Sequence, residues 1–186
     1  MRAARGIPPP ATQYPQVMAH LVLTVVGDDR AGLVQKLADV IAAHSGNWER
    51  SELAELAGAF AGIVLVEVAE DHRDALVAGL EELDGLLHIT PYTGTAPAAP
   101  PVGEQVTFTV LGNDRPGIVR DITQVLVGGG LTIDRFTSRT IAAPMSGGEL
   151  FEATVSAHAR EGDAVADAVA ELEELAGEIQ VDLVVG

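Results

Sequence analysis

The feature that most constrains the fold of this chain is an internal repeat. The segment Gly27–Val34 recurs as Gly112–Val119, 85 positions later, and both copies follow the pattern Gly-x-Asp-Arg-x-Gly-[Leu/Ile]-Val. Apolar positions before and after the segment match at the same offset. Self-similarity over this length indicates that one structural unit occurs twice. We therefore expect two domains of the same fold.

Each repeat predicts the same order of elements. Val106, Phe108 and Val110 alternate with polar residues, which is typical of a half-buried strand. Apolar residues after the loop recur at helical spacing. In repeat 1 we expect a strand before residue 27, a helix from 33 to 44, strands over 48–56 and 60–69, a helix over 71–83 and a strand over 87–93. The later segments of repeat 2 fall at 131–141, 149–159, 163–175 and 179–185.

This βαββαβ order predicts an α+β protein with two ferredoxin-like domains in tandem, each an antiparallel sheet with helices on one face. We expect a disordered or loosely docked tail over residues 1–17 and domain 1 over 18–93. A Pro/Ala-rich linker should follow over 94–103, and domain 2 over 104–186. Repeat 2 should carry a longer, glycine-containing loop over 142–148.

Charge and composition exclude several classes of function. The chain has 11 Lys+Arg against 27 Asp+Glu and a net charge of −16; each repeat carries −9 and the first 17 residues carry +2. Such a charge opposes direct binding to nucleic acid or to an anionic membrane. The absence of cysteine excludes disulfides, thiolate metal sites and a cysteine nucleophile. No apolar run reaches the length of a membrane span, and we expect a cytoplasmic protein.

The repeated loop is the densest motif, and it joins a strand to a helix. Free amides of the first helical turn, with the positive end of the helix dipole, suit a carboxylate. Asp29 or Asp114, just outside that turn, suits an ammonium group, so the pair of subsites fits an α-amino acid. We expect Gly32 and Gly117 to let another group approach the backbone, and Pro116 to occupy the first helical position.

A purely structural interpretation of the same loop stays open. Asp28 or Asn113 can serve only as an N-cap, which contributes about 1 kcal/mol. Asp29 and Arg30 can form a surface ion pair that contributes less than about 1 kcal/mol. If the loop does bind an anion, the second carboxylate at Asp28 should disfavour it, so we expect repeat 2 to hold the better site.

The loop motif within a βαββαβ unit of this length resembles the ACT domain, an amino-acid-sensing module of metabolic enzymes and regulators. Tandem ACT chains of this size resemble the glycine cleavage system transcriptional repressor family. In ACT domains the loop and an edge strand of a neighbouring unit usually enclose the ligand. The resemblance therefore implies these ligand-binding residues: Asp29, Arg30, Gly32, Leu33, Asn113, Asp114, Arg115, Gly117 and Ile118.

The resemblance implies a non-enzymatic, amino-acid-sensing regulatory protein, in the context of glycine cleavage genes. It implies glycine or a similar amino acid as ligand, and a protein partner such as a transcription factor or a metabolic enzyme. One alternative is a regulatory subunit, or the detached regulatory half, of an amino-acid or one-carbon enzyme. Another is a structural ACT pair without ligand. A homodimer is consistent with the exposed edge strands of such sheets.

Other residues give no sign of catalysis, cofactor or metal. The five histidines share no metal-ligand spacing, so we expect no metal site. His20 and His88 fall on strands that should be neighbours, and we expect a partly buried structural pair. We expect Trp48 in the core or an interface, and Arg135 and Arg139 on an outward strand face. The sequence contains no Gly-x-Ser-x-Gly elbow and no Gly-rich dinucleotide loop, so we expect no catalytic residues and no cofactor.

Overall fold

The structure is a computed structural model that describes residues 17–93, 103–143, 148–159, 163–174 and 180–185. The chain divides into two compact units, residues 1–98 and 99–186, and each is described by itself. The expected tail up to residue 16, nearly all of the expected linker, and residues 144–147 of the longer loop in repeat 2 lie outside the described residues.

Both units follow the expected βαββαβ order. In domain 1 the elements are β1 (Met18–Asp28), α1 (Leu33–Ala43), β2 (Asn47–Leu56), β3 (Ala59–Ala69), the 3-10 turn η1 (Glu70–His72), α2 (Arg73–Glu81) and β4 (His88–Tyr92). In domain 2 they are β5 (Glu104–Asn113), α3 (Ile118–Gly128), β6 (Leu131–Ala142), β7 (Glu149–Ala159), α4 (Asp163–Glu174) and β8 (Gln180–Val185).

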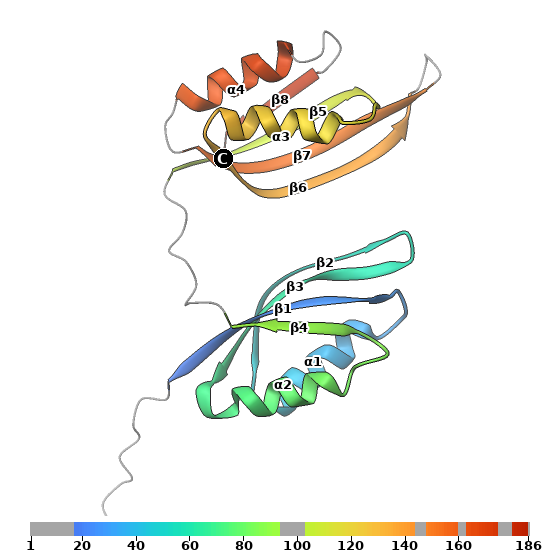
Figure 1. The fold of residues 1–186 in the computed structure, drawn as a ribbon, viewed down its shortest axis with the longest axis vertical. Coiled ribbons are helices and arrows are strands. Elements are labelled where there is room, and N and C mark those ends of the chain that lie inside the picture. The colour runs from blue at the N-terminus through green and yellow to red at the C-terminus, as the bar shows by residue number, and fades with distance from the viewer. Residues whose placement is uncertain (1–16, 94–102, 144–147, 160–162, 175–179, 186) are drawn as a thin grey trace, which may run out of the picture. The chain divides into compact units, whose positions relative to one another are not determined.

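Each domain is one antiparallel sheet covered by helices on one face. The strand orders are β2-β3-β1-β4 and β6-β7-β5-β8, so the first strand of each repeat is central. Figure 1 shows α1 and α2 on the same face of their sheet, and α3 and α4 on the same face of theirs. The predicted fold class, two ferredoxin-like α+β domains in tandem, is confirmed.

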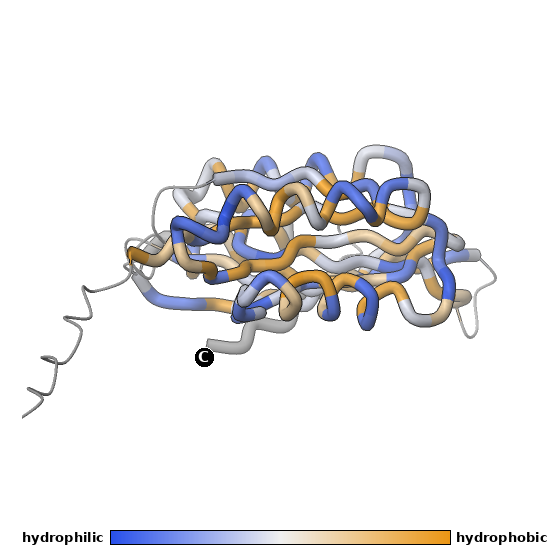
Figure 2. Tube along the Cα trace, turned by 90° about the horizontal axis from the view of Figure 1, so that it is seen from below, coloured by the Kyte–Doolittle hydropathy of each residue, from blue (hydrophilic) through white to orange (hydrophobic). Residues whose placement is uncertain are grey.

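The core of each domain lies between the helices and the sheet. In β1 every second residue is buried, including Leu21, Leu23 and Val25, and these pack with Leu37 and Ile41 of α1. Full burial of such a side chain contributes roughly 1.5–3 kcal/mol. Figure 2 shows hydrophobic and hydrophilic residues alternating around the helical coils, which matches helices with one face on a core.

A β-bulge is repeated in both sheets. The pairing of β2 with β3 shifts between Trp48 and Arg50, and the pairing of β6 with β7 shifts between Ile133 and Arg135. The residue inside the bulge, Glu49 in domain 1, has no direct partner across the ladder. Each bulge places an acidic side chain beside the neighbouring strand.

Among the described residues, no helix combines the length and the apolar character needed to cross a membrane.

Candidate functional site: the loops after β1 and β5

The loop after the first strand is held against the rest of its own domain. A Cβ on Gly27 would lie 2.4 Å from the carbonyl oxygen of Leu86, so this position accepts only glycine without movement. The amide of Asp29 donates to the carbonyl of Gly58, in the β2–β3 turn, at 2.8 Å. In domain 2 the amide of Asp114 donates to the carbonyl of Glu149 at 3.0 Å. The aspartate of the motif is thus fixed at its backbone in both repeats.

The second glycine of the motif is required by backbone conformation. Gly32 and Gly117 have φ values of 89° and 88°, in the left-handed region. No atom lies within 4 Å of a Cβ placed on Gly32, and on Gly117 the nearest is Nη2 of Arg120 at 3.4 Å. The left-handed backbone alone therefore favours glycine at both positions, and approach of a ligand group to them stays a prediction.

Two expectations about helix initiation are wrong. Gly32 and Gly117 are themselves the N-cap residues, with no side-chain capping bond, so neither Asp28 nor Asn113 caps its helix. Pro116 lies two residues before Ile118, where α3 begins, and is not the first helical residue. A left-handed glycine therefore occupies the N-cap position of each helix, where a polar residue was expected. Asp29 and Asp114 lie before this position, outside the helix.

The first helical turn presents backbone amides beside the loop. The first bonds within the helices run from Lys36 N–H to Gly32 O and from Asp121 N–H to Gly117 O, both at 3.0 Å. Amides before those positions have no intrahelical acceptor. Leu33 and Ile118, two of the predicted ligand-binding residues, are buried in the cores of their domains.

In domain 1 the loop holds cations with weak or no partners. Arg30 Nη2 lies 3.3 Å from Asp28 Oδ2, and both side chains are about half exposed or more, so this pair contributes little. The sequence suggested an ion pair between Arg30 and Asp29, but in the structure Arg30 pairs with Asp28. Lys36, one turn into α1, makes no ion pair within residues 17–93.

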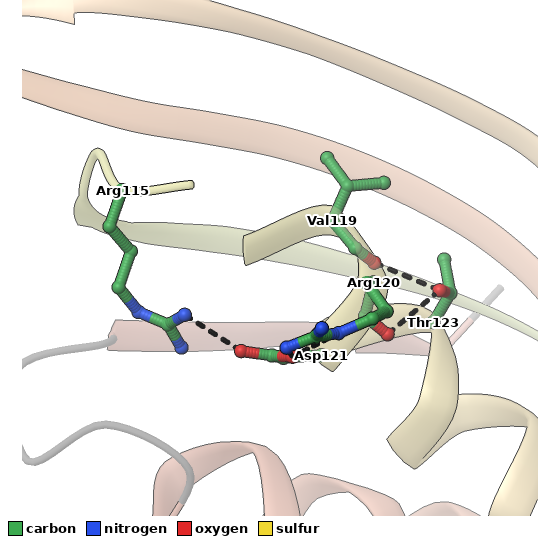
Figure 3. Close-up of polar contacts among 5 residues, drawn as sticks. All are labelled: Arg115, Val119, Arg120, Asp121 and Thr123. Atoms are coloured by element: carbon green, nitrogen blue, oxygen red, sulfur yellow. Dashed lines mark hydrogen bonds and ion pairs between the residues drawn. The ribbon is translucent and has the colours of Figure 1, made fainter. Parts of the chain in front are cut away.

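In domain 2 an acid of the same helix engages the cations. Asp121, which occupies the position of Lys36, lies 2.7 Å from Arg115 Nη1 and 2.8 Å from Arg120 Nη2 (Figure 3). Hydrogen bonds from Arg115 and then Arg120 hold the pKa of the Asp121 carboxyl below its usual range. The two arginines are thus partly neutralised before any ligand arrives.

The two loops differ in how their charged side chains are paired. The case for repeat 2 depended on the second carboxylate at Asp28, and in the structure Asp28 lies beside Arg30. Domain 2 instead gains a carboxylate, Asp121, within its first helical turn. The expectation that repeat 2 holds the better ligand site stays a prediction.

A shallow groove between α3 and α4, of about 330 Å³, reaches the loop region only through Asp121. Its other lining residues are helical: Gln124, Val125, Gly128 and Glu171. The groove lies on the helical layer of domain 2 and does not contain the residues of the repeated motif.

The expected pair of histidines is not formed. His88 pairs with Val26, near the C-terminal end of β1, while His20 pairs with Glu67 at the other end. His20 instead lies near Glu49 and Glu67, a grouping that spacing along the chain does not reveal because three strands contribute to it.

The remaining sequence predictions concern side chains outside the loop. Trp48 is partly buried against the core of domain 1, as expected. Arg135 and Arg139 are exposed on β6, also as expected, and Arg139 is paired with Glu152.

Comparison with known proteins places this geometry in a family. Residues 19–90 match the family model described as the ACT domain. The UPF0237 protein MK1213 of Methanopyrus kandleri is 37% identical over 65 residues, which are 35% of this chain and 70% of that protein. The chain belongs to the ACT-domain family, whose members are regulatory modules.

Two solved structures match nearly the whole tandem. An unknown protein from Galdieria sulphuraria has a TM-score of 0.78 at 29% identity, covering 91% of this chain and 99% of that one. A candidate glycine cleavage system transcriptional repressor has a TM-score of 0.68 at 18% identity, with the same coverage. The second likeness concerns the fold, and the chain is similar to that protein in its two-domain layout.

Proposed function

We propose that the chain is a non-enzymatic regulatory protein that binds an α-amino acid, glycine or a similar one, at the loop after β1. The observation that carries the proposal is the arrangement of that loop. The exposed Asp29 has its backbone fixed by Gly58, and it lies just before a helix whose first-turn amides have no intrahelical acceptor. The amides can donate to the carboxylate of an amino acid, and the side chain of Asp29 can accept from its ammonium group, so the loop matches both charges of the ligand.

Lys36 and Arg30 support domain 1 as the stronger of the two sites. Both cations lie on the loop or the first turn of α1, and only Arg30 has a partner in residues 17–93. In domain 2 the corresponding loop offers Asn113, Asp114 and Arg115, with Arg115 bound to Asp121. A ligand there competes with an internal carboxylate, which lowers its affinity.

The signal passes, in this proposal, to a protein partner in the cytoplasm. The ligand acts through its higher affinity for one arrangement of the chain or of a homodimer. A charge of −16 suits a protein partner better than DNA. Similarity to a candidate glycine cleavage repressor suggests a transcription factor as that partner. Recovery of a metabolic enzyme in a pull-down would instead favour the regulatory-subunit alternative.

Calorimetry with paired variants tests the assignment of the site. We expect Asp29→Ala to weaken amino-acid binding at least about tenfold, since it removes the acceptor for the ammonium group. We expect Asp114→Ala to have a smaller effect. Glu81→Ala, at an exposed end of α2, is the matched control for lost charge. Equal losses in both loops, or a loss only in Asp114→Ala, would contradict the preference for domain 1.

A further inference from the structure

A second cluster of polar side chains lies on the face of the domain 1 sheet that the helices leave uncovered. We propose that His20, Glu49 and Glu67 form a binding site for one divalent transition-metal ion, with Zn²⁺ as the probe. The neighbours of His20 and Glu67 along their strands, Leu21 and Val66 among them, are buried in the core. Alternation along a strand therefore directs His20 and Glu67 to the opposite face.

Three adjacent strands supply one ligand each. His20 on β1 is the direct partner of Glu67 on β3, and Asn47 on β2 is the partner of Glu67 on its other side. Glu49 occupies the bulge between Trp48 and Arg50. A bulge redirects its extra side chain, and here it brings the Glu49 carboxylate beside the other two groups.

The distances suit a shared ion better than a hydrogen-bonded cluster. Nε2 of His20 lies 3.7 Å from Oε2 of Glu49 and 3.9 Å from Oε1 of Glu67. Both distances exceed the roughly 2.7–3.2 Å of a hydrogen bond. The three ligand atoms lie within 4.8 Å of one another. Metal–ligand bonds of about 2.0–2.2 Å at tetrahedral angles would separate such atoms by about 3.4 Å, so small side-chain movements suffice.

Charge and exposure also fit a cation. A neutral imidazole with two carboxylates carries −2, which a divalent ion balances, and within residues 17–93 neither glutamate pairs with lysine or arginine. The side chains of His20, Glu49 and Glu67 are 25%, 31% and 30% exposed, so water can complete the coordination. Imidazole and carboxylate ligands together are typical of Zn²⁺ and neighbouring transition metals.

Domain 2 provides an internal comparison, because the same three positions exist there with different chemistry. Gln105 on β5 pairs with His158 on β7, as His20 pairs with Glu67. Asp134 occupies the equivalent bulge in β6. Here Nδ1 of His158 contacts Oδ2 of Asp134 directly, and the third position is an amide. With one carboxylate instead of two, domain 2 should bind the ion far more weakly.

Equilibrium dialysis of the tag-free, metal-stripped full chain against ZnCl₂ tests the site. We expect one Zn²⁺ per chain, bound at least about tenfold more weakly by His20→Gln and by Glu67→Gln. His158→Gln and Glu81→Gln are the controls for domain 2 and for general negative charge, and should bind as the unaltered chain does. With Co²⁺ in place of Zn²⁺, loss of the visible absorption bands in Glu67→Gln reports on direct coordination.

Three results would contradict the proposed metal site. Absence of Zn²⁺ binding by the unaltered chain would overturn the proposal, as would equal binding by all four variants or a loss confined to His158→Gln. Because Glu67→Gln keeps the size of the side chain and Glu67 is partly exposed, circular dichroism should show an unchanged fold, and Glu49→Gln offers the same measurement at an exposed position. The result is independent of amino-acid binding at the loops.

Discussion

Asp121 of domain 2 stands where domain 1 has Lys36, and Arg120 stands where domain 1 has Gln35, so the charges at the start of the two helices are arranged differently. Lys36 leaves a positive charge at the start of α1, while Asp121 engages Arg115 and Arg120. The Asp121 carboxylate is therefore stabilised in its charged form in the folded state. Its contribution to stability must depend on pH.

We expect Asp121→Asn to destabilise domain 2 near neutral pH and to have a decreasing effect in acid. Arg115 first, and then Arg120, lower the folded pKa of Asp121, so this stabilisation is present above the ordinary range near 4. It is lost as pH falls through the lowered folded value. Urea unfolding of both proteins between about pH 7 and pH 2 measures the difference. A difference that grows in acid would contradict the account, and Asp84→Asn, an exposed acid in domain 1, is the control.

Gly32 should not tolerate a side chain even though it has open space around it. With φ at 89°, an L-residue there costs about 1–2 kcal/mol. We expect Gly32→Ala to lose about that much unfolding free energy. Gly128→Ala, at the end of α3 and equally open, should gain about 0.5–1 kcal/mol because its backbone is not left-handed. Thermal or urea unfolding that shows equal effects would refute the conformational explanation.

The residues of the motif could be predicted from sequence, but their contacts could not. Repetition identified Asp29, Gly32 and their counterparts. The bond from Asp29 to Gly58 depends on where the β2–β3 turn falls against the loop, and no local pattern records that. Capping by Asp28 was wrong because a left-handed glycine at position 32 places the helix start later than a polar cap would.

The two repeats use different residues at the same position of the turn that follows α1 and α3. The residue after the C-cap is left-handed in both, Ser45 with φ at 59° and Gly130 with φ at 79°. Glycine is the usual residue at this position because other residues pay a steric cost there. Domain 1 therefore carries local strain that domain 2 avoids.

We expect Ser45→Gly to stabilise domain 1 by about 0.5–1 kcal/mol, since relief of the left-handed cost exceeds the added flexibility of glycine. The reverse change, Gly130→Ser, should destabilise domain 2 by a similar amount. Hydrogen exchange of the two helices, measured in each variant, resolves the domains separately. Destabilisation by Ser45→Gly would show that the serine side chain contributes more than its backbone costs.

The order of the elements and the buried face of each could be predicted because both depend on the periodicity of apolar residues along the chain. The alternation of Val106, Phe108 and Val110 with polar residues predicted a strand with one face in the core, and all three side chains are buried. The second helix begins later than expected, since residues 70–72 form the separate turn η1. Arg73, the first residue of α2, pairs with Glu70 of that turn and with Asp74. Ion pairs of this kind do not produce a periodic pattern of apolar residues, so periodicity did not indicate where α2 begins.

Taken as a whole, the molecule is two copies of one acidic domain, each with a net charge of −9. The copies share topology, register, bulge and loop, but their polar side chains have diverged at matching positions. Lys36 of domain 1 is equivalent to Asp121 of domain 2, and Glu67 of domain 1 is equivalent to His158 of domain 2. Divergence at fixed positions on a constant fold is consistent with separate ligands for the two domains, and family resemblance alone did not predict it.

The most direct test of the central proposal is a thermal-shift screen of the full chain against the twenty amino acids, with glycine first. A ligand at about 100 times its Kd adds about 2.7 kcal/mol to the stability of the domain that binds it. For a domain of this size we expect a rise in Tm of about 4–8 °C with at least one amino acid. We also expect Asp29→Ala to abolish that rise. No rise with any amino acid would contradict the proposal and favour a structural ACT pair.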